Sequence, residues 1–166
     1  MKRSFLIALI CFLNLTGSIA QKKLPNVSVK SLDGKEILSS EFDNQGKPII
    51  LSFWATWCKP CLSELTAFND EFEDWQEETG VKLIAVSIDD ARTNARVKSL
   101  VNGKDWPFEV YLDPNQNLKR ALNIVNIPYT LVLNGKGEIV WKHTSYNPGS
   151  EEEVIQVVRE LVSKNK

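Results

Sequence analysis

The chain has 166 residues, of which 43% are hydrophobic and 25% charged, and its formal net charge at pH 7 is −1. This composition is that of a globular domain with a full core, and it excludes wholesale disorder. The balanced charge also leaves no basic field, so a nucleic-acid partner is not expected.

Residues 1–20 are predicted to be a secretory signal peptide. Lys2 and Arg3 precede a short apolar run, and small residues then lead to a cleavage site after Ala20. An uncleaved membrane anchor is the alternative, although the run is shorter than the ~20 residues of a spanning helix. Cys11 is expected to be removed with the signal peptide. The alternative is a lipidated cysteine, but lipidation requires a small residue just before the cysteine, and this chain has Ile10 there.

The remaining residues, 21–166, are predicted to form one α/β domain. Alternating polar and apolar residues on both sides of an Asp-Gly pair indicate an N-terminal β-hairpin. The continuous apolar run at residues 48–55 predicts a strand buried on both faces. Apolar residues at three- and four-residue steps then predict a helix from Leu62 to Gly80, where the glycine ends it.

The second half of the chain continues this alternation and ends in a second hairpin and a helix. These elements are expected over residues 81–88 (strand), 91–100 (helix), 108–113 (strand), 115–122 (helix), 130–143 (hairpin) and from 150 onward (helix). Asp89 or Asp90 is expected to cap the helix over 91–100. Strands separated by helices pair in parallel, whereas hairpins add antiparallel strands. The prediction is a mixed central β-sheet flanked by helices.

The motif Cys58-Lys59-Pro60-Cys61 lies where the first buried strand passes into a helix. A cysteine at a helix N-terminus is favoured as thiolate, the species that attacks disulfides, and Cys61 follows within reach of a bond. So short a loop would stabilise little, which favours a reversible disulfide over a structural one. A zinc half-site and a chance spacing are the alternatives. Zinc would need two further ligands, and His143, interpreted as a strand residue, is the sole histidine.

The stretch FWATWCKPC resembles the active-site signature of the thioredoxin superfamily. Residues 24–163 as a whole resemble its exported TlpA/ResA-like thiol-disulfide oxidoreductases, in the AhpC/TSA-redoxin branch. The resemblance implies a thioredoxin-like fold with an extra helix inserted in the middle. It also implies that Cys58 and Cys61 are the redox pair and that Pro128 is a cis-proline facing them. From the residues alone, an ordinary trans turn proline is favoured at Pro128.

Three further residues are predicted to contact the substrate. Trp57 and Lys59 flank the attacking cysteine in the sequence, so Trp57 is expected on its rim and Lys59 to add positive potential. Ile127 precedes the implied cis-proline, and the resemblance places it close to the cysteines. An apolar residue at that position resembles disulfide reductants more than strong oxidants.

Glu64 is a candidate replacement for a buried acid that ordinary thioredoxins have and this chain lacks. Ordinary thioredoxins carry a buried Asp six residues before the first cysteine, and Ser52 occupies that position here. Glu64 falls at the edge of the apolar arc of its helix, three residues after Cys61, as in the TlpA/ResA-like pattern. Our hypothesis is that Glu64 is partly buried, has a raised pKa and relays a proton to or from Cys61. The alternative is a surface Glu stabilised by the helix N-terminus.

The predicted function is an extracytoplasmic disulfide reductase without cofactor or metal, acting by dithiol/disulfide exchange through Cys58 and Cys61. Its expected partners are disulfide-containing client proteins and a membrane thiol electron donor; apocytochrome c is a client by resemblance only, and a monomer is expected. A peroxiredoxin-like thiol peroxidase is the main alternative, but Thr56 stands two rather than three residues before Cys58 and no Arg is close in sequence. A chaperone with incidental cysteines is the second alternative.

Overall fold

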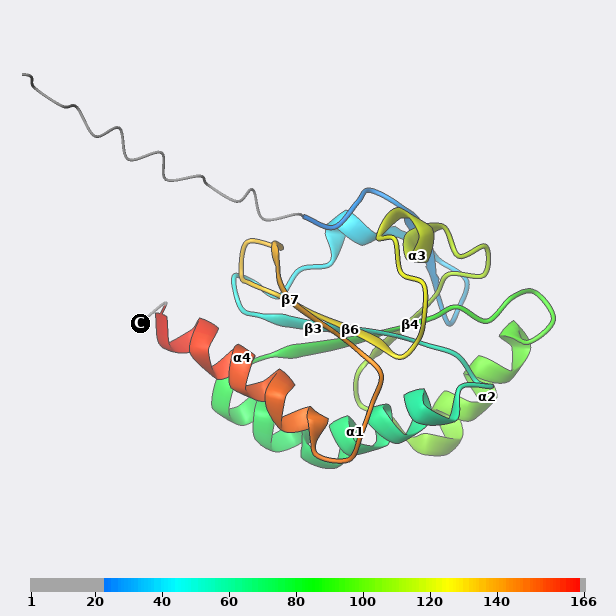
Figure 1. Ribbon diagram of the computed structural model, residues 1–166. Helices are drawn as coiled ribbons and strands as arrows, with labels where there is room; N and C mark the ends of the chain where they lie inside the picture. The colour runs from blue at the N-terminus through cyan, green and yellow to red at the C-terminus, as the bar shows by residue number, and fades with distance from the viewer. Residues whose placement is uncertain (1–22, 165–166) are drawn as a thin grey trace, which may run out of the picture.

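The structure is a computed structural model that describes residues 23–164; Figure 1 shows the arrangement of its elements. The predicted signal peptide, its cleavage site and Cys11 lie outside the described residues. Within the described range, every helix is too short or too polar to span a bilayer.

A seven-stranded sheet forms the centre of the fold. Its strands are β1 (Ser28–Ser31), β2 (Glu36–Leu38), β3 (Ile49–Trp54), β4 (Lys82–Ser87), β5 (Glu109–Leu112), β6 (Tyr129–Leu133) and β7 (Ile139–Thr144). They lie in the order β2-β1-β5-β4-β3-β6-β7. β4 pairs in parallel with β3 and β5, whereas the other neighbours are antiparallel. The predicted mixed sheet and both hairpins are therefore confirmed.

Helices cover both faces of this sheet. They are α1 (Lys59–Thr79), α2 (Asn94–Lys104), α3 (Asn117–Ala121) and α4 (Ser150–Lys164), with a 3₁₀ turn, η1, at Ser39–Glu41. Figure 1 shows α1, α2 and α4 on one face and α3 on the other. The crossovers explain this division, because β3-α1-β4 and β4-α2-β5 advance in the same direction along the sheet and are right-handed.

Strand β3 lies in the middle of the sheet and carries the chain toward the cysteines. All six of its residues are buried, as its unbroken apolar sequence predicts for a strand covered on both faces. Only Ser52 interrupts this run with a hydroxyl group. Residue Phe53 of β3 pairs with Tyr129, so β6 begins at the same end of the sheet at which β3 ends.

Helix α1 begins immediately after Cys58 and packs its apolar stripe onto the sheet. The buried residues Leu65, Phe68, Phe72 and Trp75 recur at the spacing of one helical face. The helix ends at Gly80, whose left-handed backbone, with φ of 67°, suits a residue without a Cβ atom.

The start of α2 differs from the expectation. The helix begins at Asn94 rather than Ala91, and Thr93 occupies its N-cap position without a side-chain hydrogen bond. Asp90 instead accepts hydrogen bonds from the backbone and guanidinium of Arg92 in the preceding turn. Asp89 is buried and binds elsewhere, so the predicted cap by either aspartate is wrong.

Candidate functional site

The two cysteines form a disulfide across the first turn of α1. Cys58 is the N-cap residue of the helix, and its Sγ lies 2.03 Å from that of Cys61, with 5.3 Å between the Cα atoms. The missing N–H of Pro60 costs nothing here, because it would have no intrahelical acceptor in the first turn. The motif therefore joins the two cysteines that the spacing suggested.

The cysteines differ in access and in their relation to the helix. Cys58 keeps 6% of its surface exposed, whereas Cys61 has 0%. The backbone N–H of Cys61 donates a hydrogen bond of 3.3 Å to the sulfur of Cys58. Free N–H groups and the positive end of the helix dipole favour a negative sulfur at this position once the bond is reduced. The geometry suits Cys58 as the attacking sulfur and Cys61 as the shielded one.

The residues beside Cys58 reach into solvent. Trp57 is 60% exposed, which is unusual for so large an apolar side chain, and Lys59 is exposed on the other side of the cysteine. Together they border the more accessible end of the disulfide. Their contact with substrate stays a prediction.

The Ile127–Pro128 peptide bond is cis. Pro128 directly precedes β6, whose first residue pairs with Phe53 near the end of β3, so it stands at the same end of the sheet as the disulfide. Its carbonyl oxygen accepts hydrogen bonds from the Ser145 backbone at 3.1 Å and from the Thr144 hydroxyl at 3.4 Å. Ile127 is half-buried against the core. The cis bond implied by the family resemblance is thus present.

Glu64 is buried one turn after Cys61, with 2% of its surface exposed. Its two carboxyl oxygens accept hydrogen bonds from Ser52 Oγ at 2.9 Å and from Thr130 Oγ1 at 3.0 Å. Burial raises the pKa of Glu64 to about 7, while the two hydrogen bonds act in the opposite direction. Glu64 is thus buried with a raised pKa, as helix phase and the family pattern together suggested, and the surface alternative is wrong. The relay of a proton between Glu64 and Cys61 stays a prediction.

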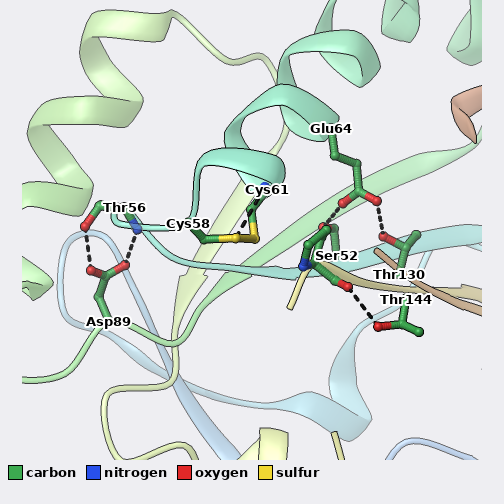
Figure 2. The surroundings of a disulfide bond; sticks show 9 residues. Ser52, Thr56, Cys58, Cys61, Glu64, Asp89, Thr130 and Thr144 are labelled. Carbon is green, nitrogen blue, oxygen red and sulfur yellow. Dashed lines mark hydrogen bonds between the residues drawn. A yellow bond between two sulfur atoms is a disulfide. The ribbon is translucent and has the colours of Figure 1, made fainter. Parts of the chain in front are cut away.

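The two hydroxyl donors come from a single cross-strand pair. Ser52 of β3 and Thr130 of β6 are direct register partners, and both point to the α1 face of the sheet, where they meet Glu64 (Figure 2). In the sequence, Ser52 was notable only because it occupies the position of the buried Asp of ordinary thioredoxins, and the role of Thr130 was not predicted. The available signal was the threonine that follows Tyr129 and precedes three aliphatic residues in strand β6.

A second buried acid, Asp89, lies on the other side of the disulfide (Figure 2). Its carboxylate accepts hydrogen bonds from the backbone N–H of Thr56 at 2.8 Å, from the Thr56 hydroxyl at 2.6 Å and from Ser87 Oγ at 2.8 Å. These bonds tie the end of β4 to the loop that leads into Cys58. Asp89 is therefore a positioning residue that the sequence analysis misread as a helix cap.

Nothing in this geometry resembles a metal site. Within the described part of the chain, no three His, Cys, Asp or Glu side chains gather in a way that could hold a metal ion. His143 lies on β7 and approaches Glu153 of α4, with 3.9 Å between Nδ1 and the carboxylate oxygen. This contact lies at the surface, where both side chains are partly exposed.

Residues 20–142 match the AhpC/TSA family. The chain belongs to this family. Among its relatives, the thiol-disulfide oxidoreductase ResA of Bacillus thuringiensis subsp. konkukian is 32% identical over 119 residues, which are 72% of this chain and 66% of the relative. The sporulation thiol-disulfide oxidoreductase A of Bacillus subtilis is 31% identical over 146 residues, 85% of either chain. The resemblance to the TlpA/ResA-like proteins is confirmed.

A solved structure gives the same result for the fold. The solution structure of an uncharacterized thioredoxin-like protein from Porphyromonas gingivalis is similar with a TM-score of 0.78 and 49% sequence identity. The similarity covers 86% of this chain and 94% of that one. The AhpC/TSA chain described here thus has the predicted thioredoxin-like fold, with α2 as the inserted helix.

Proposed function

We propose that this AhpC/TSA-family protein is an extracytoplasmic protein-disulfide oxidoreductase that reduces the disulfides of client proteins. The observation that carries the proposal is the Cys58–Cys61 disulfide at the N-terminus of α1, with the buried carboxyl of Glu64 one turn further on. Relatives named thiol-disulfide oxidoreductases support the same chemistry. The signal peptide predicted at residues 1–20 supports export.

The reaction begins with the reduced pair. The Cys58 thiolate attacks one sulfur of the client disulfide; a bond forms between Cys58 and that sulfur, the client bond breaks, and its other sulfur leaves as a thiolate that takes up a proton. The N–H of Cys61, which donates to the Cys58 sulfur in the disulfide, stabilises the negative charge before the attack.

The second step forms the disulfide seen in the structure. Cys61 gives its thiol proton to the Glu64 carboxylate and attacks the Cys58 sulfur, which releases the client's second sulfur as a thiolate. A pKa of about 7 allows Glu64 to accept and return that proton near neutral pH. In sum the two cysteine sulfurs supply the client's two electrons, while one of its two protons comes from Cys61 and the other from solvent.

Sulfur carries the electrons, so the proposed reaction requires no cofactor. The reduced pair must be regenerated, and we assign this step to a membrane thiol donor, because an exported protein has no access to cytosolic reductants. The apolar Ile127 before the cis-proline supports the reducing direction. Through the family resemblance, reduction of apocytochrome c during cytochrome c maturation is the proposed client reaction, carried out by a monomer.

The peroxidase alternative gains no support from the geometry. The hydroxyl of Thr56, the residue such a site would use, donates a hydrogen bond of 2.6 Å to Asp89 instead of facing a peroxide beside Cys58.

Trapping of clients tests the proposal. In the variant Cys61→Ala the second step is blocked, so clients are expected to accumulate as mixed disulfides on Cys58, visible as reducible high-mass bands after acid quenching. The matched control, Cys58→Ala with Cys61 retained, is expected to trap almost none, since Cys61 is shielded. Equal trapping by the two variants, or none by the first, would refute the assignment.

A further inference from the structure

A groove of about 560 Å³ lies between the active-site loop and helix α2. It is lined by Thr56, Trp57, Ala95, Arg96, Ser99 and Leu100. One wall therefore ends at Trp57, the exposed residue that adjoins Cys58. The other wall belongs to the inserted helix, which the exchange mechanism does not use.

The groove carries one positive charge, and its other lining residues are apolar or small and polar. Of its six lining residues, only Arg96 is charged. Arg92, which lies in the turn before α2, is neutralised by Asp90, with 2.6 Å between the guanidinium and the carboxylate. Within residues 23–164, no carboxylate forms an ion pair with Arg96 or with Lys59 beside Cys58.

This local charge is opposite to that of the chain, whose formal net charge is −1. The indole of Trp57 and the side chain of Leu100 offer apolar contact, and Arg96 offers a guanidinium that binds a carboxylate through two N–H donors. The groove is thus complementary to an extended peptide that carries an acidic side chain.

We propose that this groove binds the client segment next to the reactive disulfide, and that Arg96 pairs with an acidic side chain of that segment. The inference rests on the proposed function. A client sulfur bonded to Cys58 brings its neighbouring residues over Trp57, where the groove begins. At about 3.3 Å per extended residue, an acidic residue a few positions from the client cysteine reaches Arg96. Arg96 then acts as a specificity-determining residue and takes no part in the exchange of sulfur bonds.

Three peptide disulfides test this assignment. They are identical except for Asp, Ser or Lys three positions from one cysteine, and kcat/KM for their reduction is measured with wild type and Arg96→Glu. Wild type is expected to reduce the Asp peptide about two- to fivefold faster than the Lys peptide, as for exposed ion pairs. Arg96→Glu is expected to reverse the order, and 1 M salt to abolish the preference in both proteins.

Lys98→Glu is the matched control. Lys98 is also an exposed cation of α2, but it does not line the groove, so this variant changes the net charge equally and is expected to keep the wild-type preference. A wild type without preference, a preference for Lys, or an equal response of the two variants would overturn the assignment of the groove. Reduction of the Ser peptide separates the two proposals. If one of these outcomes is found while the Ser peptide is still reduced, only the groove assignment falls. If none of the three peptides is reduced, the proposed function falls as well.

Discussion

Two buried acids flank the disulfide, and they are held in different ways (Figure 2). Asp89 accepts three hydrogen bonds, one of them from the Thr56 backbone. Glu64 accepts two, both from side-chain hydroxyls. The first acid fixes the path of a loop, whereas the second carries a carboxyl whose pKa is raised to about 7 by burial.

The difference shows that burial alone does not define the role of a carboxyl. A carboxylate that accepts several donors, including a backbone N–H, becomes part of the scaffold. One whose burial outweighs its hydrogen bonds can gain and lose a proton near neutral pH. On this basis we expect substitution of Asp89 to affect the stability of the fold, and substitution of Glu64 to affect its pH dependence.

The largest effect is expected for Asp89→Ala. The substitution removes the acceptor of the partly buried Thr56 N–H and hydroxyl and of the buried Ser87 hydroxyl, which should lower the free energy of unfolding by about 4 kcal/mol. Urea unfolding of the oxidised protein measures it. Asp90→Ala is the neighbouring control: Asp90 forms its ion pair at the surface, so the substitution should leave the free energy of unfolding nearly unchanged. Similar losses for the two variants would remove Asp89 from the scaffold role.

Glu64→Gln should change how stability depends on pH. The folded protein holds the Glu64 proton with a pKa of about 7 against an ordinary value of 4.5, so folding favours the protonated form. Stability contributed by that proton is full below pH 4.5 and is lost as pH rises through 7. Relative to the Gln variant, wild type should therefore lose roughly 3 kcal/mol between pH 4 and pH 8.

Unfolding of both oxidised proteins across this pH range checks the prediction, because other titrating groups cancel in the difference. A difference that stays constant with pH would mean that Glu64 titrates normally. The same variant should flatten the pH profile of the resolving step near pH 7, which a purely structural role would leave unchanged.

A smaller effect is expected for Thr130→Val. Removing one of the hydrogen bonds that lower the pKa of Glu64 should raise that pKa further, by about one pH unit for a bond worth 1–1.5 kcal/mol. The pH profile of the resolving step should move to higher pH by the same amount. Thr66→Val is the control on α1, because its hydroxyl bonds only the Leu62 carbonyl. A profile moved equally by both variants would contradict the assigned role of Thr130.

Much of the site followed from the sequence because it depends on short-range patterns. The apolar run before Cys58 predicted a buried strand, and helical phase together with the family pattern favoured a buried Glu64. The start of α2 was predicted too early, because an aspartate between a strand and a helix is, from the local sequence, a favoured N-cap residue. The hydrogen bond that withdraws Asp89 from that role comes from Thr56, 33 residues away in the chain.

By itself the sequence determined the order of the elements and the strand-to-helix setting of the cysteines. Each of these follows from periodicity or from residues a few positions apart. Only the tertiary structure decided which groups face the two acids and the groove. Thr130 reaches Glu64 across 66 residues through the register of β6 on β3, and the crossover into α2 brings Arg96 beside Trp57. Such contacts arise from strand pairing and packing, which no local pattern records.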